Sequence, residues 1–156
     1  MNARHSSIHS RSLLRSLADF RFELRSFLCF SEQAATKNGL QPQQHQLLLQ
    51  VAGAPHTATV TIAYAAARLG LKHNSVVELV DRSEREGLLE RVADATDKRR
   101  ILLRVTRKGE NILNKLTSEH ARELNVMAPG LIAAFEQVRA HANSTHANST
   151  IDMEAK

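Results

Sequence analysis

The densest positive charge in this chain lies in one short segment, DATDKRRILLRVT, at residues 94–106. Lys98, Arg99 and Arg100 are consecutive there, and residues 97–108 hold six bases against one acid. The formal net charge of the whole chain is +5, so the excess in this segment equals that of the chain. Guanidinium and ammonium groups gathered in one place attract anions such as phosphates. The segment therefore predicts a phosphate-rich partner.

The elements that must position this charge are short helices followed by a hairpin. Thr59 or Thr61 can cap a helix over residues 62–69, Gly70 interrupts the pattern, and another helix covers about residues 73–86. The segments LLERV and ILLRVT follow. Both are rich in Leu, Val and Ile, a polar stretch separates them, and they are typical of two strands of a hairpin. A short helix, a turn, a second helix and a hairpin make a winged helix-turn-helix.

Amphipathic helices flank the winged helix. Apolar residues recur at steps of three and four up to about Ala35, and Pro42 fits the first turn of the next helix. After the hairpin, Thr106 can cap a helix, and Pro129 fits the first turn of a separate last helix. The predicted fold is therefore mainly α with a small β-hairpin wing, in the order four helices, hairpin, two helices.

The second helix of the helix-turn-helix carries side chains that can read DNA. In this motif the N-terminal residues of that helix meet base edges in the major groove. Asparagine bonds adenine through two contacts, serine can serve any base, and glutamate can accept from a cytosine amino group. The candidates for base contacts are His73, Asn74, Ser75 and Glu78, and those for phosphate contacts are Lys72 and Arg82.

The same helix also fits an ordinary solvated surface. Glu78 with Arg82, and Asp81 with Arg85, are acid–base pairs four residues apart, which solvated helices commonly use. Residues 72–100 hold seven bases and seven acids, so the helix region itself is neutral. A winged-helix module that binds proteins rather than DNA therefore stays open as an alternative, although the basic wing argues against it.

The motifs together resemble the MarR family of bacterial transcription regulators, over about residues 13–140. DKRRILLRVT follows the wing signature of that family, which is Asp, any residue, Arg, five residues and then an aliphatic–Thr pair. ARLGLKHNSVVELVDRSEREGLLERV is similar to its helix-turn-helix, and GLQPQQHQLLLQVAG to its second helix. This chain has Lys72 where many members have a Ser cap, and Ser83 where a Leu is usual.

The resemblance implies a homodimer held by the first and last helices. It also implies that Arg99 enters a minor groove from the wing tip, between Lys98 and Arg100, while Asp97 braces the wing. Narrow minor grooves concentrate negative potential and attract Arg, and a carboxylate can hold a guanidinium in a fixed geometry. The function implied is a sequence-specific transcriptional regulator of the repressor type, released from a pseudo-palindromic DNA operator by a small molecule or another signal.

The expected organisation follows from the motifs and the resemblance. The segments are a disordered N-terminus at 1–10, helical dimerisation regions at 11–36 and 107–140, a DNA-binding winged helix-turn-helix at 40–106, and a disordered tail at 141–156. The tail includes the repeat HANSTHANST, to which we assign no role.

The controlling signal has three candidates. The first is a small aromatic or other organic effector. The second is oxidation of Cys29, although an inert buried thiol is favoured because apolar residues surround it in sequence. The third is a metal held by Cys29, Glu32, His45 and His120, although no two of them have the local spacing of metal ligands.

Several classes of protein are not expected. The chain lacks the GxSxG and HExxH motifs and a phosphate-binding glycine loop, so we expect no enzyme activity and no cofactor. It has one cysteine, which allows no internal disulfide and fits the cytoplasm. No stretch approaches the roughly 18 apolar residues of a membrane span, and no signal peptide is evident.

Overall fold

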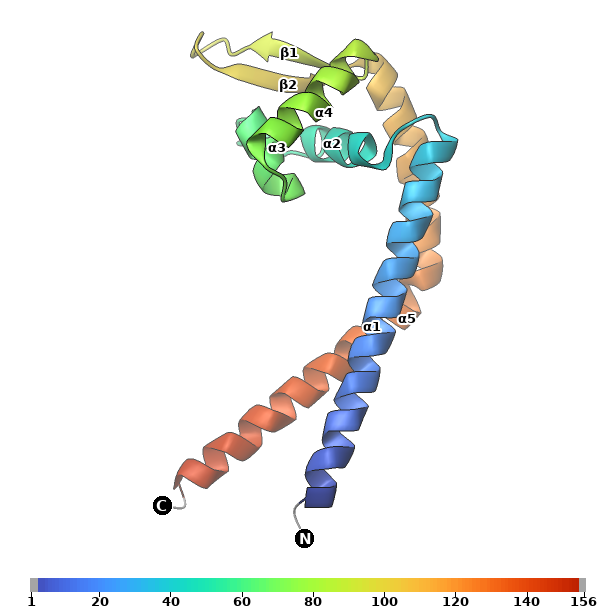
Figure 1. Cartoon of the computed structure of the whole chain (residues 1–156), viewed down its shortest axis with the longest axis vertical. Helices are drawn as coiled ribbons and strands as arrows, with labels where there is room; N and C mark the ends of the chain where they lie inside the picture. Colours follow the sequence, from blue (N-terminus) through green and yellow to red (C-terminus); the bar gives the residue numbers. More distant parts are fainter. Residues whose placement is uncertain (1–2, 155–156) are drawn as a thin grey trace. The chain divides into compact units, whose positions relative to one another are not determined.

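A computed structural model of the chain describes the backbone of residues 3–154 and the side chains of residues 11–141 and 143. Its elements are α1 (Ala3–Lys37), α2 (Pro42–Ala52), α3 (Ile62–Leu69), α4 (His73–Arg85), β1 (Leu89–Ala93), β2 (Ile101–Val105) and α5 (Arg107–Glu154), as Figure 1 shows. The strands form one antiparallel hairpin. The predicted fold class, mainly α with a small β-hairpin wing, is confirmed.

The chain divides into two compact units. The winged unit comprises residues 31–120, and the helical unit comprises residues 1–30 and 121–156. The disorder expected for residues 1–10 and 141–156 stays a prediction, because nearly all of their side chains lie outside the described residues, while the helical backbone of α1 and α5 extends into both segments. The assignment of dimerisation and DNA binding to particular segments is likewise untested.

Local signals fix the helices of the winged unit. Thr61, rather than Thr59, caps α3: its hydroxyl accepts a hydrogen bond from the backbone N–H of Tyr64 at 3.3 Å. Gly70 ends α3 with a φ of +65°, a conformation that favours glycine. Leu47 and Leu48 of α2 are fully buried, as the apolar face of that helix predicts.

The buried face of α4 packs on this core. Val76, Leu79, Val80 and Ser83 are all fully buried, and they are the stripe that helical spacing places on one side. Ser83 stands where the resemblance leads us to expect Leu. Its hydroxyl donates to the carbonyl of Leu79 at 2.8 Å, one turn back on α4. The polar group is thereby satisfied inside the core.

The wing is attached at the middle of β2 and at the residue that follows the strand. Leu103 donates its backbone N–H to the carbonyl of Val60 at 2.7 Å, so the loop before α3 supports the strand. Thr106 ends the hairpin and caps α5, because its hydroxyl accepts from the N–H of Gly109 at 3.3 Å and donates to the carbonyl of Gly87 at 2.6 Å. The start of α5 is thus joined to the end of α4.

The helical unit pairs α1 with α5 in antiparallel orientation. Ser16 donates to the amide oxygen of Gln137 at 3.2 Å, and the rings of Phe20 and Phe135 lie 6.1 Å apart. Residues that come later in α1 therefore meet residues that come earlier in α5. The expectation of a separate last helix starting at Pro129 is wrong, because α5 runs through this residue without a break. A proline inside a helix removes one backbone donor, yet α5 is helical on both sides of Pro129.

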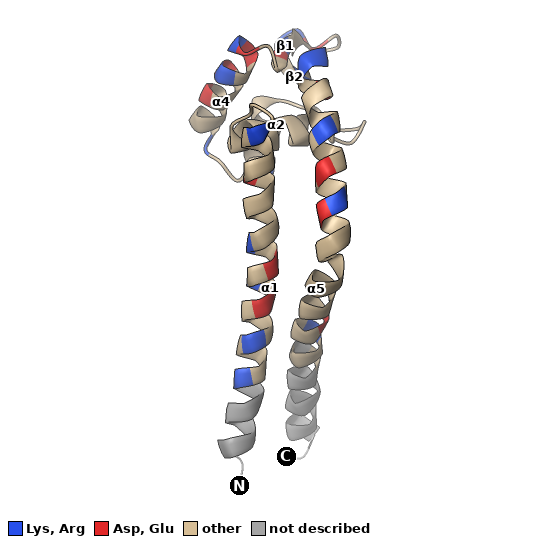
Figure 2. Cartoon of the chain, turned by 90° about the vertical axis from the view of Figure 1, so that its right-hand side faces the viewer, with Lys and Arg blue, Asp and Glu red and all other residues tan. Residues whose placement is uncertain are grey.

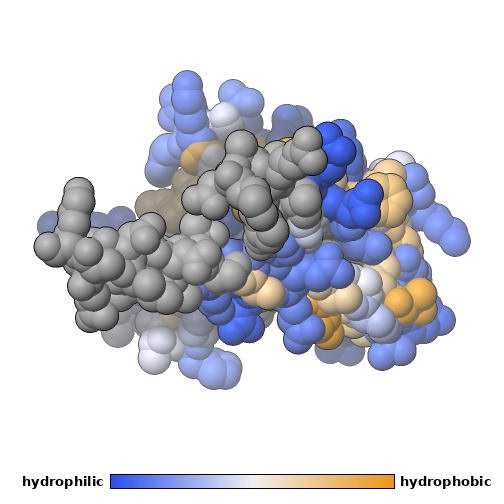
Figure 3. Space-filling model, turned by 90° about the horizontal axis from the view of Figure 1, so that it is seen from below, coloured by the Kyte–Doolittle hydropathy of each residue, from blue (hydrophilic) through white to orange (hydrophobic). Residues whose placement is uncertain are grey.

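Large apolar side chains of the helical unit are exposed in the single chain. Figure 3 shows apolar surface in orange among hydrophilic side chains. The exposed residues of this kind are Leu14, Leu17, Phe22, Leu24 and Leu28 of α1, and Leu124, Val126, Ile132 and Phe135 of α5. Contiguous exposed apolar surface is typical of a protein–protein interface. Within the described part of the chain, no helix is both long enough and apolar enough to span a membrane.

Candidate nucleic-acid interface

The N-terminal half of α4 presents its polar side chains to solvent. All five of the residues predicted to contact DNA there are exposed: Lys72, His73, Asn74, Ser75 and Glu78. Lys72 occupies the N-cap position and makes no capping hydrogen bond with its side chain, as its replacement of a Ser cap implies. Within the described residues, these five side chains form no hydrogen bond or ion pair with another part of the chain, so they are available to a ligand.

The C-terminal half of α4 is instead tied to the wing. Arg91 of β1 forms ion pairs with Asp81, at 2.5 Å, and with Glu84, and its backbone N–H donates to the same Glu84 carboxylate at 3.1 Å. Burial alone would lower the pKa of Arg91, but the hydrogen bonds to the two carboxylates raise it above its ordinary value. This clamp fixes the hairpin against α4.

Neither of the two ion pairs that helical spacing favours within α4 forms among the described residues. The carboxylate of Asp81 pairs with Arg91, and Arg85 donates to the backbone carbonyl of Asp81 at 3.3 Å. Among the described residues, no ion pair joins Glu78 to Arg82. Figure 2 shows acidic and basic residues alternating along α4, so the helix region is close to neutral as the sequence predicts.

The wing tip is ordered by two aspartates and one arginine. Arg100 lies 3.4 Å from the carboxylate of Asp94 and 3.7 Å from that of Asp97. Asp94 also accepts from the N–H and the hydroxyl of Thr96, each at 2.8 Å. These hydrogen bonds, with the charge of Arg100, hold the pKa of Asp94 below its ordinary value. The loop is thus closed on itself by charge-assisted contacts.

Arg99 is left projecting from this ordered tip. Its backbone N–H donates to Asp97 at 3.1 Å, and its Nε lies 3.7 Å from the same oxygen. Its side chain is 94% exposed, against 44% for that of Arg100. Asp97 therefore contacts both Arg99 and Arg100, as the bracing role in the resemblance implies. The side chain of Arg100 is the less exposed of these two partners. Lys98 is exposed beside them.

Two predicted signal residues, His45 and His120, lie together in the winged unit. Their rings are 4.9 Å apart. His120 Nδ1 is 2.6 Å from the carbonyl of Leu116, so it is the donor, and Nε2 is 2.8 Å from the hydroxyl of Ser31. Burial, and then the nearby His120, lower the pKa of His45 to about 4. His45 is therefore neutral near pH 7.

A third candidate signal residue, Cys29, differs from the expectation. Cys29 is exposed in the single chain, so its description as a buried thiol is wrong. The described residues contain no group of three or more His, Cys, Asp or Glu side chains arranged to hold a metal ion. The histidine pair accordingly lacks the further ligands that the metal alternative requires.

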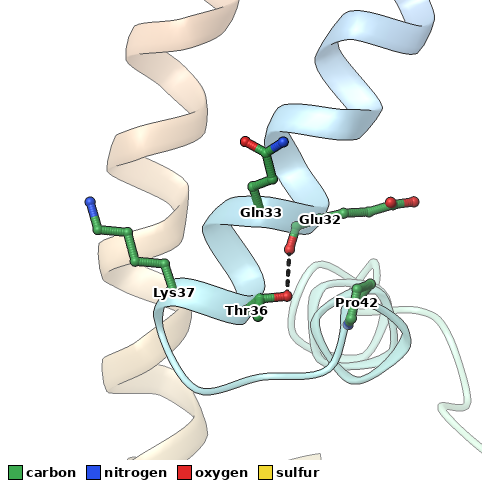
Figure 4. Close-up of a pocket in the computed structure, with 5 residues that line it drawn as sticks. All are labelled: Glu32, Gln33, Thr36, Lys37 and Pro42. Carbon is green, nitrogen blue, oxygen red and sulfur yellow. Dashed lines mark hydrogen bonds between the residues drawn. The ribbon is translucent and has the colours of Figure 1, made fainter.

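A shallow groove of about 520 Å³ lies where α1 ends and α2 begins. Its lining residues are Glu32, Gln33, Thr36, Lys37 and Pro42. In Figure 4 the side chains of Glu32 and Lys37 point in opposite directions, and the hydroxyl of Thr36 donates to the carbonyl of Glu32 at 3.0 Å. The groove offers one cation and one carboxylate to a small molecule.

Sequence reasoning missed the contacts that orient α4 from its C-terminal end. These are the Arg91 clamp and two contacts to Glu86: the amide of Gln44 donates to its carboxylate at 2.9 Å, and Lys108 donates to its backbone carbonyl at 2.8 Å. An arginine at the centre of a short strand could have indicated the clamp. Nothing local indicates the pairing of Gln44 with Glu86, because 42 positions separate them.

Comparison with known proteins finds similarity to one protein family and to a curated transcriptional regulator. The model of the MarR family matches residues 38–100. The HTH-type transcriptional regulator MhqR of Bacillus subtilis (strain 168) is 30% identical over 91 residues, which are 58% of this chain and 61% of MhqR. The match thus spans less than two thirds of that relative.

Solved structures share the fold across most of the chain. A MarR family transcription regulator has a TM-score of 0.71 at 19% identity and covers 92% of this chain and 96% of its own. A MepR variant from S. aureus bound to an oligodeoxyribonucleotide has a TM-score of 0.59 at 22% identity, covering 85% and 94%. CouR from Rhodococcus jostii RHA1, bound to p-coumaroyl-CoA, has a TM-score of 0.61 at 23% identity, covering 77% and 83%. The winged-helix fold is confirmed.

Proposed function

We propose that this chain is a member of the MarR family and a sequence-specific DNA-binding transcriptional regulator of the repressor type, since the model of that family matches residues 38–100 and MhqR is 30% identical over 91 residues. It acts as a homodimer on a pseudo-palindromic operator in the cytoplasm, without enzyme activity or cofactor, and an effector releases it. The match to MhqR and the DNA-bound MepR variant support DNA as the partner.

The proposal rests on the exposure of the Arg99 side chain at the wing tip. This side chain is 94% exposed, although the neighbouring Arg100 is engaged by Asp94 and Asp97. An ordered loop that projects a largely exposed guanidinium into solvent is suited to enter a narrow minor groove, where the negative potential is concentrated. Lys98 adds a second exposed cation for the adjacent phosphates.

The exposed half of α4 supplies the base contacts in this proposal. Asn74 binds an adenine edge, His73 and Ser75 read neighbouring positions, and Glu78 accepts from a cytosine amino group. Lys72, at the start of the helix, binds a phosphate together with Arg82.

A second copy of the chain completes the binding unit. The exposed apolar side chains of the helical unit, such as Phe22 at 68% and Val126 at 74%, are the surface that the second copy covers. Two recognition helices in successive major grooves lie roughly 34–36 Å apart, one turn of DNA. The operator therefore repeats its half-sites at that spacing.

The effector in this proposal is a small aromatic or other organic acid that binds the groove beside Lys37. The ammonium group of Lys37 binds the carboxylate of the acid, and the CouR complex with p-coumaroyl-CoA supports an organic ligand for this fold. Band-shift competition with an aromatic acid panel tests this: at least one acid should release wild-type protein but not Lys37→Ala. Release of both proteins alike would exclude this groove as the site.

The DNA-binding proposal is tested by the salt dependence of binding. A duplex is selected from a randomised pool by the wild-type protein, and its dissociation constant is measured between 50 and 200 mM salt. A dimer that neutralises several phosphates should lose affinity by orders of magnitude over this range. A protein-binding module would select no duplex, and its weak DNA binding would show no preference among sequences.

A further inference from the structure

The contacts that orient α4 are concentrated at one end of the helix. Within the described residues, the polar contacts that join α4 and its C-cap to other elements begin at Asp81 and continue through Glu84 to Glu86. The N-terminal end, where Lys72 makes no capping contact, has no such tie. The buried face at Val76 packs on the core, but apolar packing has little directional preference.

This arrangement makes the far end of the helix sensitive to its anchor. The 13 residues of α4 span about 20 Å at 1.5 Å per residue. A rotation of about 5° at the C-terminal end therefore moves the N-terminal residues by about 1.7 Å. Hydrogen bonds to base edges require donor–acceptor distances within a few tenths of an ångström of their optimum. The direction of α4 for base reading therefore depends on the contacts at its C-terminal end, and those at Glu86 are among them.

The anchor at Glu86 has two attachments from different elements. Gln44 of α2 is 1% exposed, and its amide N–H donates to the Glu86 carboxylate at 2.9 Å. The amide oxygen of Gln44 is also engaged, because it accepts from the N–H of Gln41 at 3.0 Å. Lys108 of α5 holds the backbone carbonyl of Glu86 at 2.8 Å. The Gln44 amide therefore has one fixed orientation, set by the first turn of α2.

We propose that the Gln44–Glu86 contact is a positioning device that sets the direction of α4 and thereby the sequence preference of the protein. Glu86 touches no DNA in this proposal. It acts through Asn74 and the other base-reading residues, so the inference rests on the proposed function. Loss of the contact should weaken binding to the preferred sequence and leave non-specific phosphate binding unchanged.

The experiment compares Glu86→Ala with Glu110→Ala in the full-length protein. Both side chains are exposed glutamates near the start of α5, and both changes remove one negative charge. Each protein is titrated at fixed salt with the duplex selected by the wild type and with a shuffled duplex of the same composition. The measured quantity is the ratio of the two affinities.

Glu86→Ala should lower this ratio about tenfold, the effect of losing a hydrogen bond to a charged group. Glu110→Ala should leave it at the wild-type value, and Glu86→Gln should retain most of it, since its amide oxygen still accepts from Gln44. If Glu86→Ala melts well below the wild type, the decision rests on Glu86→Asp, which keeps the charge but shortens the reach and should also lower the ratio.

Equal ratios for Glu86→Ala and Glu110→Ala would overturn the positioning role, as would a parallel loss of affinity for both duplexes. If the wild type itself selects no duplex, the proposed function fails and the inference fails with it. If the wild type and Glu86→Ala prefer the selected duplex over the shuffled duplex equally well, the positioning role is refuted and the proposed function stands.

Discussion

Acid should destabilise this protein through one buried histidine. His45 is 3% exposed and lies 4.9 Å from the ring of His120. Its pKa is about 4 in the folded chain, against 6.5 for an unperturbed histidine. The unfolded chain therefore binds more protons between these two values, and the stability contributed by neutral His45 is present above pH 6.5 and is lost as the pH falls towards 4.

The magnitude follows from the two pKa values. At pH 4.5 the loss relative to pH 7 is about 2 kcal/mol in the free energy of unfolding. Urea unfolding at both pH values, at one protein concentration, measures it. Since other groups titrate in the same range, the comparison is with His45→Leu, which cannot be protonated and should lose about 2 kcal/mol less between pH 7 and pH 4.5.

His56→Leu is the matched control, because His56 is exposed and belongs to the same unit. It should show the same acid-dependent loss as the wild type. The reasoning is refuted if His45→Leu and the wild type lose the same free energy on acidification, since His45 would then titrate alike in the folded and unfolded chains.

Two further predictions concern packing and accessibility. Gly109→Ala should destabilise the protein by about 2 kcal/mol, because an added Cβ would lie 2.3 Å from the carbonyl oxygen of Leu88. The control is Gly130→Ala in the same helix, which meets only the flexible end of Glu23 at 3.1 Å and should be nearly neutral. Equal melting temperatures for the two variants would contradict this packing. The exposed thiol of Cys29 should be alkylated completely without denaturant, and labelling that requires denaturant would contradict its exposure. A separate measurement tests oxidation: if mild peroxide leaves DNA binding intact, the redox alternative is excluded.

Much of the winged helix could be predicted because its boundaries are set by local chemistry. Thr61 and Gly70 bound α3 at the residues that capping preferences indicate, and the buried stripe of α4 follows from helical spacing alone. The exposure of the residues at the start of α4 follows from the same spacing, since one face must remain outside when the other is buried.

The remainder depends on contacts between residues distant in the sequence. Helical spacing favours an ion pair between Asp81 and Arg85, but Asp81 pairs with Arg91 instead. The hairpin brings the guanidinium of Arg91 within reach of two carboxylates at once. Pro129 favours a helix start by its local preference, yet α5 continues through it. Sequence patterns record local preferences, and tertiary packing decides between them.

In the proposed complex with DNA, the wing tip inserts Arg99 into a minor groove. The most direct measurement is the affinity of Arg99→Ala for the selected duplex, compared with Arg122→Ala, which removes the same charge from an exposed position in the helical unit. Arg99→Ala should weaken binding by roughly 1–3 kcal/mol without lowering the melting temperature, while Arg122→Ala should change the affinity little. Equal affinities for the two variants would show that Arg99 does not contact the DNA.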